Sequence, residues 1–181
     1  MSKVYTFLAD GLEEIECLAV VDLLRRANIE VCMVSIGEDL MINGSHHISI
    51  KADALFKDVS FDDADLLFLP GGGLGTSNLG KHEGLKKLLL QFAEQGKKLA
   101  AICAAPSILG ELGILKGKSA VCFPGFEEKL LGASICKDKV VTDGAITTAK
   151  GMGCSIDLGL ELIRIFSGEA AMENMKKNIQ Y

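Results

Sequence analysis

The chain has no apolar run that approaches the roughly 20 residues a membrane-spanning helix needs. It also has no excess of positive charge, since 19 lysines and arginines stand against 24 aspartates and glutamates and give a formal net charge of -5. An acidic surface does not attract nucleic acid or an anionic membrane, so we expect neither as a partner. The N-terminus is too short and becomes acidic too early to act as a signal peptide. These absences predict a cytoplasmic protein.

Paired cysteines and histidine clusters are also missing. None of the six cysteines stands at C-x-x-C spacing, and they lie in apolar segments more than in loops, which favours reduced thiols. Only three histidines occur. Two of them are adjacent, at His46 and His47, and no cysteine or acid stands near them at metal-ligand spacing. The sequence therefore predicts no metal site.

The chain does have a regular succession of apolar strands and amphipathic helices. We expect strands at 3–9, 30–36, 66–69, 99–102 and 119–123, a hairpin at 139–148, a small antiparallel excursion within 41–52, and helices at 13–27, 85–95 and 169–178 with a long helix opening after 151–154. Strand, helix and strand in this order predict parallel pairs with right-handed crossovers. No repeat or linker divides the 181 residues. The pattern predicts one three-layer α/β domain over residues 1–181 with a mostly parallel sheet.

Cys103 stands between a buried strand and the start of a helix. The run Leu99–Ile102 ends at this cysteine, and Pro106 then occupies a helix position where a missing N–H matters least. A sharp strand-to-helix turn of this kind is a nucleophile elbow, and free N–H groups at a helix start favour a thiolate. The alternative is a small buried residue that happens to end a core strand. These residues alone leave the two interpretations balanced.

Glu16 falls on the apolar stripe of the first predicted helix, with Val20 and Leu23, whereas Glu14 falls on the opposite, polar side. A carboxyl group on a buried face either finds a partner or stays protonated because its pKa is raised. The alternative is a half-exposed acid in the first turn of a helix, where negative charge is favourable.

A glycine cluster, Pro70–Gly75, follows the predicted strand at 66–69. It lacks the third glycine of a dinucleotide-binding motif, and it does not follow the first strand. The segment from Gly75 to Lys81 resembles a phosphate-binding loop, but His82 replaces the magnesium-binding hydroxyl. We interpret the cluster as a strand end whose small residues let backbone N–H groups approach the neighbouring strand.

Five motifs together resemble the ThiJ/PfpI superfamily, and most of all the branch of the parkinsonism-associated protein deglycase and its bacterial relatives. They are D-G-x-E-E-I-E, L-P-G-G-G-L-G, A-A-I-C-A-A-P, C-F-P-G-F-E-E-K-L and T-x-x-G-M-G, in this order along nearly the whole chain. The resemblance implies a flavodoxin-like sandwich and a homodimer. It also implies that Cys103 is the reactive cysteine, that Glu16 is the acid bonded to it, and that the Gly72 and Ala104 amides surround a bound oxyanion. A protonated Glu16 would then hold Cys103 as a thiolate with a lowered pKa.

Departures from the family pattern limit which of the family's activities we expect for this chain. Ala104 stands where the peptidase-like branch has a histidine directly after the cysteine. None of the three histidines is placed to form the distant His–Glu pair that a glutamine amidotransferase needs. We therefore expect neither activity. Phe123 stands where the deglycase branch often has a histidine, so proton transfer would depend on Glu16, or on His46 reaching in from a partner subunit. Cys154 stands where relatives usually have threonine or serine.

The expected function is a cysteine-dependent enzyme without cofactor or metal, of the glyoxalase or protein-deglycase kind, that acts on reactive carbonyls such as methylglyoxal. Cys103 would attack the aldehyde and Glu16 would move protons. The alternative is an oxidative-stress sensor or redox-regulated chaperone in which Cys103 becomes a sulfinate. A flavin-binding module has only fold analogy behind it.

Overall fold

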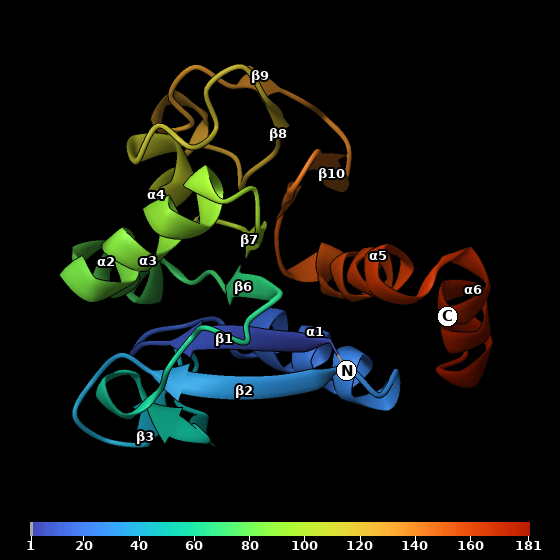
Figure 1. The fold of residues 1–181 in the computed structure, drawn as a ribbon, viewed down its shortest axis with the longest axis horizontal. Helices are drawn as coiled ribbons and strands as arrows, with labels where there is room; N and C mark the ends of the chain where they lie inside the picture. The colour runs from blue at the N-terminus through green and yellow to red at the C-terminus, as the bar shows by residue number, and fades with distance from the viewer. Residues whose placement is uncertain (1) are drawn as a thin grey trace.

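A computed structural model describes residues 2–181, and its centre is a seven-stranded sheet in the order β10-β11-β7-β6-β1-β2-β5 (Figure 1). The neighbouring strands are parallel except β10 and β11, which form an antiparallel hairpin. The strands are β1 (Lys3–Leu8), β2 (Glu30–Ser35), β5 (Ala54–Leu55), β6 (Leu66–Leu69), β7 (Lys98–Ile102), β10 (Val140–Asp143) and β11 (Ile146–Ala149). The prediction of an α/β fold with a mostly parallel sheet is confirmed.

The central strands are apolar on both faces because helices cover both. Along β6, Leu66 and Phe68 join one core, whereas Leu67 and Leu69 join the other. The same alternation holds along β1, where Val4 and Phe7 belong to different cores. The first core is closed by α1 (Glu14–Arg26), α5 (Ser155–Ser167) and α6 (Glu169–Asn178), and the second by α2 (Gly73–Lys81), α3 (Glu83–Glu94) and α4 (Pro106–Glu111).

The order of the strands reverses at β1. The chain runs from β1 to β2 on one side and returns to β6 on the other, so the loops after β1 and β6 diverge at the carboxyl edge of the sheet. Open α/β sheets bind ligands at such a switch point. β7 lies beside β6, so the turn after β7 comes to the same edge.

Helix α2 is the largest difference from the sequence prediction, which expected a glycine-rich strand end at this place. Gly72 has a φ of +93°, which turns the chain sharply after β6, and the helix begins at the next residue. Within it, a Cβ on Gly75 would lie 2.7 Å from Leu12 Cα. Gly75 therefore permits the helix to pack against the β1–α1 loop, an approach that no local pattern indicates.

Two further segments differ from the prediction in detail. The strand expected at 119–123 is reduced to β8 (Ser119–Ala120), which pairs in parallel with β9 (Ser134–Ile135) in a separate small sheet. Directly after β8, Val121 N–H donates to the side-chain oxygen Thr148 Oγ1 of β11 (3.0 Å) and not to a backbone carbonyl, so the strand pairing does not continue. The predicted excursion within 41–52 is confirmed as β3 (Met41–Asn43) against β4 (Ser49–Lys51), joined by a loop of five residues and not by a tight turn.

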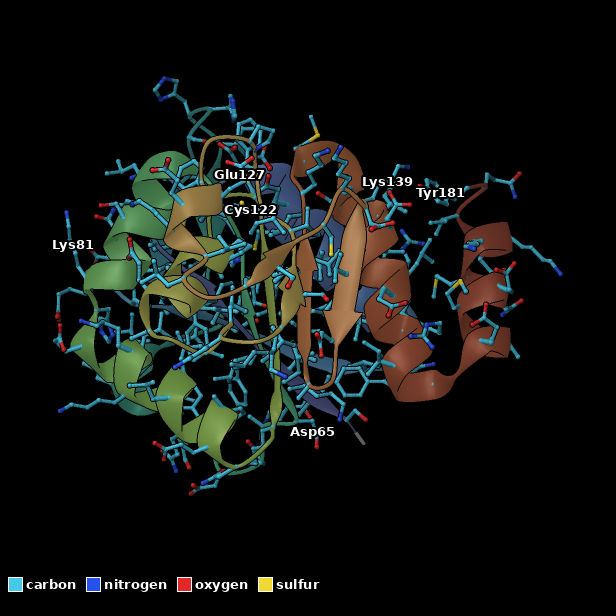
Figure 2. The ribbon with its side chains drawn as sticks, turned by 90° about the horizontal axis from the view of Figure 1, so that it is seen from above. Asp65, Lys81, Cys122, Glu127, Lys139 and Tyr181 are labelled. Atoms are coloured by element: carbon cyan, nitrogen blue, oxygen red, sulfur yellow. The ribbon has the colours of Figure 1, made fainter. Side chains whose placement is uncertain are left out.

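Three short 3-10 segments lie between other elements: η1 (Phe56–Asp58) after β5, η2 (Glu127–Lys129) after β8 and η3 (Met152–Cys154) before α5. The C-terminal residue is held to α5, since Tyr181 Oη donates to Asp157 Oδ1 (2.9 Å), and Lys139 reaches the same carboxylate from the start of β10 (Figure 2). Among residues 2–181, no helix is both long enough and apolar enough to cross a membrane.

Candidate functional site

Cys103 lies at the sharp turn that follows β7. Its φ is +64°, a left-handed conformation that is unusual for a residue with a side chain and that marks backbone strain. Two backbone hydrogen bonds hold it: Cys103 N–H donates to Ala149 O (3.0 Å), and Phe123 N–H donates to Cys103 O (2.8 Å). The side chain is half-buried and its thiol is free. The turn thus presents one cysteine at the carboxyl edge of the sheet, as the sequence predicted.

Glu16 lies in the first turn of α1, is only 1% exposed, and faces Cys103 across Gly71. Gly71 N–H donates to Glu16 Oε2 (3.0 Å). A Cβ on Gly71 would collide with that same carboxylate oxygen and with Cys103 Cβ. The carboxyl group and the cysteine therefore share one small space, which exists because residue 71 has no side chain.

Burial determines how the two groups hold their protons. It raises the pKa of Glu16 to about 7, although hydrogen bonds from Cys103 and Gly71 act against it. Burial and the Glu16 carboxylate together raise the pKa of the Cys103 thiol to about 12. The sequence predicted a lowered cysteine pKa, and that prediction is wrong because these two effects outweigh the nearby amides. Of the two groups Glu16 has the lower pKa, so its carboxylate is the base placed to accept the thiol proton.

Gly72 and Ala104 are the backbone donors nearest to the sulfur. Hydrogen bonds from their amides lower the pKa of Cys103 against the larger effect of burial. The Gly72 amide follows β6 and the Ala104 amide follows β7, and these two strands are neighbours in the sheet. The structure therefore brings both predicted donors to the cysteine. Their role toward a bound oxyanion stays a prediction.

Phe123 stands at the rim of this space and is 47% exposed. A Cβ on Gly151 would lie 3.1 Å from Phe123 Cδ2 and 4.0 Å from Glu16 Oε1, so the ring and the carboxyl group border the same glycine. Phe123 brings no titratable group to this rim. Cys154, at the end of η3, is half-buried, and its N–H donates to Gly151 O (2.7 Å).

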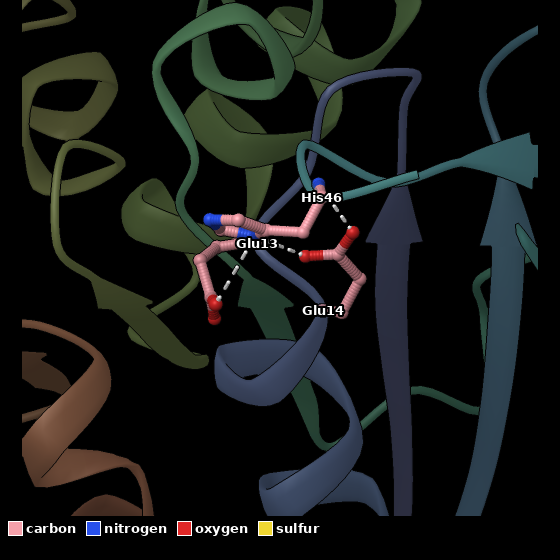
Figure 3. Close-up of side chains that lie close together, drawn as sticks. All are labelled: Glu13, Glu14 and His46. Carbon is pink, nitrogen blue, oxygen red and sulfur yellow. Dashed lines mark hydrogen bonds and ion pairs between the residues drawn. The ribbon is translucent and has the colours of Figure 1, made fainter. Parts of the chain in front are cut away.

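His46 lies beside the N-terminus of α1, bound to Glu14 of its own chain (Figure 3). The Glu14 carboxylate bonds the ring nitrogen His46 Nδ1 (2.8 Å) and accepts from His46 N–H (2.7 Å). Glu14 is only 1% exposed, which corrects the prediction that it points to the polar side of the helix. It is buried because the β3–β4 loop folds over it. A reach of His46 into a partner subunit stays a prediction.

Charge explains why this buried acid is tolerated. Although burial acts against it, hydrogen bonds from the His46 side chain and backbone lower the pKa of Glu14 to about 2. The same contact raises the pKa of His46. Glu14 is therefore an ionised, paired acid, whereas Glu16, two residues later, is not paired with a cation.

The group Glu13, Glu14 and His46 is the cluster of described side chains whose ligand atoms all lie within 4.8 Å of one another. The Glu14 oxygens are already bonded to His46, and all three residues lie at the N-terminus of α1, where the helix dipole disfavours a cation. The geometry favours an ion pair over a metal site.

Two residues that shape the site were not singled out from the sequence. Glu13 caps α1, since its Oε2 accepts from Glu16 N–H (2.7 Å), and its charge adds to the raised pKa of Glu16. The three-residue spacing from Glu13 to Glu16 is the capping signal that could have indicated it. Gly71 could have been suggested only by its place in the glycine cluster, because its role depends on two side chains from distant segments.

Several known proteins are similar in sequence to this chain, among them the following three. Protein DJ-1 homolog B of Arabidopsis thaliana is 36% identical over 162 residues, which are 89% of this chain and 37% of that protein. Protein dj-1beta of Drosophila melanogaster is 32% identical over 182 residues, 99% of this chain and 97% of that protein. Deglycase PYRAB04690 of Pyrococcus abyssi is 28% identical over 144 residues, 78% of this chain and 86% of that protein. The chain spans about two fifths of the length of the Arabidopsis relatives it matches.

The fold of the chain is also similar to those of solved structures. Toxoplasma gondii DJ-1, in a structure described as oxidized, superposes with a TM-score of 0.96 at 30% identity, covering 100% of this chain and 99% of that one. A model of the DJ-1/PfpI family matches residues 2–165. With a flavodoxin-like sheet, an elbow cysteine and a buried acid beside it, the chain belongs to the DJ-1/PfpI family.

Proposed function

We propose that this protein is a cysteine-dependent enzyme that converts reactive carbonyls without a cofactor, of the glyoxalase or protein-deglycase kind. The observation that carries the proposal is the placement of Glu16 against Cys103, with a glutamate pKa of about 7. A group with a pKa near the working pH both accepts and returns a proton readily. The name of the Pyrococcus abyssi relative, a deglycase at 28% identity, supports the same class of activity.

With methylglyoxal, each step can be assigned to residues of the site. Glu16 takes the thiol proton as Cys103 sulfur bonds to the aldehyde carbon, and the carbonyl oxygen becomes an alkoxide near the Gly72 and Ala104 amides. Protonation of that oxygen gives a hemithioacetal and frees Glu16 to act again. Glu16 then removes the proton from the former aldehyde carbon and returns it to the ketone carbon, while the hydroxyl proton passes to the former ketone oxygen, which leaves a lactoyl thioester on Cys103. Water hydrolyses the thioester, releases lactate and restores the thiol. The aldehyde carbon is oxidised as the ketone carbon is reduced, so no external redox partner is needed.

The test compares variants in a methylglyoxal assay. We expect Cys103→Ala to abolish turnover and Glu16→Gln to reduce it by about 10²-fold or more, because Gln cannot accept a proton. Cys136→Ala, which changes a cysteine in the loop after β9, should keep normal activity. Full activity in Cys103→Ala would reject the proposal.

A second function is an oxidation sensor, which the oxidized structure of the Toxoplasma gondii relative favours. Glu16 and the two amides could hold the oxygens of a sulfinate on Cys103. Intact mass after mild peroxide treatment would separate the two functions. A sensor should gain two oxygens stoichiometrically at Cys103 while methylglyoxal turnover stays negligible.

The partners and location are also proposals. The exposed apolar residues Ile15 and Leu18 on α1, with Met152 in η3 and Ile156 in α5, support a homodimer through this face, since α1 and α5 pack side by side. Light scattering of the protein and of Ile15→Lys would test it. Six free cysteines support a reducing, cytoplasmic location.

A further inference from the structure

A polar cavity of about 240 Å³ lies between α2 and α4, beside the elbow, and the proposed chemistry does not use it. One wall is a face of α2 that runs from Gly73 through Thr76 and Ser77 to Lys81. The opposite wall includes Ser107 on α4. The cavity thus lies along the segment from Gly75 to Lys81, whose sequence resembles a phosphate-binding loop. That segment is helical, so its own N–H groups are used within α2 and the side chains decide what the cavity can bind.

The inner end of the cavity is lined by residues close in the chain to the two amide donors of Cys103. Gly73 directly follows Gly72, whose amide bonds the sulfur. On the other wall, Ser107 Oγ donates to Ala104 O (2.7 Å), the residue that carries the second amide. From Gly73 to Lys81 the helix rises about 12 Å at 1.5 Å per residue. A molecule bound at Cys103 could therefore extend along α2 toward Lys81.

Charge and hydrogen-bonding capacity identify what would lie there. The Thr76 hydroxyl oxygen is itself buried, so the hydroxyl that α2 offers to a ligand is that of Ser77, which is exposed. Lys129 at the edge of the cavity is paired with Glu111 (3.4 Å), so these two charges offset each other. Lys81 forms no ion pair with any residue in the described range 2–181, and it extends outward from the end of α2 (Figure 2). One uncompensated positive charge therefore remains.

The apolar part of the cavity is small. Ile108 from α4 and Phe126 from the segment before η2 supply it. A ligand that matches these walls has a short apolar body next to its carbonyl and a negative group at the far end. The Ser77 hydroxyl and the Lys81 ammonium would face that negative group.

We propose that this cavity binds the carboxylate of substrates that carry one, so that the protein prefers carboxylate-bearing 2-oxoaldehydes over neutral ones of the same shape. This inference rests on the proposed function for its turnover test. The preference arises from Lys81 and the Ser77 hydroxyl, whereas the chemistry at Cys103 is the same for both kinds of substrate.

The experiment compares 4-carboxyphenylglyoxal with phenylglyoxal, which differ by one charged group. We expect kcat/KM to be about two- to five-fold higher for the carboxylate, as for an exposed ion pair. Lys81→Gln should remove the preference, Lys81→Glu should reverse it, and 0.5 M salt should weaken it. Rates with phenylglyoxal should stay unchanged in both variants. Lys87→Gln, which removes an exposed lysine of α3 outside the cavity, is the matched control.

A second readout does not depend on turnover. The rate of Cys103 labelling by N-(4-carboxyphenyl)maleimide relative to N-phenylmaleimide, followed by mass spectrometry, should show the same preference and the same loss in Lys81→Gln. Equal labelling ratios in the wild type and Lys81→Gln would overturn the cavity proposal even if both aldehydes are substrates. If neither aldehyde is turned over but the labelling ratio depends on Lys81, the proposed enzyme function would be rejected and the proposal that the cavity binds a carboxylate would be supported.

Discussion

The buried carboxyl of Glu16 should make the protein less stable as the pH rises, and Glu16→Gln should remove this effect. Its pKa is raised from 4.5 to about 7, which makes its ionisation in the folded protein about 3 kcal/mol less favourable than in the unfolded chain. An acid with a raised folded pKa binds more protons when folded. The free energy of unfolding therefore falls between pH 4.5 and pH 7 and levels off above that.

Glutamine has nearly the same shape, and its amide oxygen can still accept from Gly71 N–H, but it cannot ionise. We expect the unfolding free energy of Glu16→Gln to match that of the wild type near pH 4.5 and to exceed it by about 2–3 kcal/mol at pH 8. Urea unfolding at pH 4.5, 6, 7 and 8 measures the difference. Both proteins should carry Cys103→Ser, so that thiol ionisation does not contribute.

The matched control is Glu94→Gln, which removes an exposed carboxyl that forms no ion pair with residues 2–181. It should shift stability by less than about 0.5 kcal/mol at each pH. If the gain in Glu16→Gln is the same at pH 4.5 and pH 8, the carboxyl does not change ionisation in this range. The argument that burial sets its pKa would then fail, and with it the assignment of Glu16 as a base near pH 7.

Three further predictions concern the same end of the sheet. Alkylation of Cys103 by iodoacetamide, followed by mass spectrometry, should accelerate through about pH 7 in the wild type as Glu16 becomes a base, but not in Glu16→Gln; identical profiles would show that the thiol titrates independently. Gly71→Ala should destabilise the fold by about 1–3 kcal/mol in urea and lower methylglyoxal turnover, because its Cβ collides with Glu16 and Cys103; normal activity would contradict the close approach. Glu14 has a lowered pKa of about 2, so its contribution to stability is complete above pH 4.5 and is lost as the pH falls toward 2; Glu14→Gln should lose about 1–2 kcal/mol at pH 6 and less at pH 3, and a constant loss would argue against an ionised Glu14.

The central strands and the cysteine turn could be predicted because their signals are local. A parallel strand covered on both faces must be a short, continuous apolar run, and Leu66–Leu69 is one. Cys103 ends a similar run and is followed by small residues and a proline, a pattern typical of a sharp turn into a helix. The apolar stripe of α1 likewise indicated that Glu16 is buried.

Contacts between distant segments decided the rest. Gly75 lies in a helix instead of a loop because α2 packs against Leu12, more than 60 positions earlier in the chain. Glu14 is buried because a loop about 30 residues later folds over it, which helix periodicity cannot indicate. The sequence, through its resemblance to the ThiJ/PfpI superfamily, indicated which residues meet, namely Cys103 and Glu16. Only the tertiary structure decided the direction in which the cysteine pKa shifts, because burial, which depends on the whole fold, outweighs the local amides that favour a thiolate.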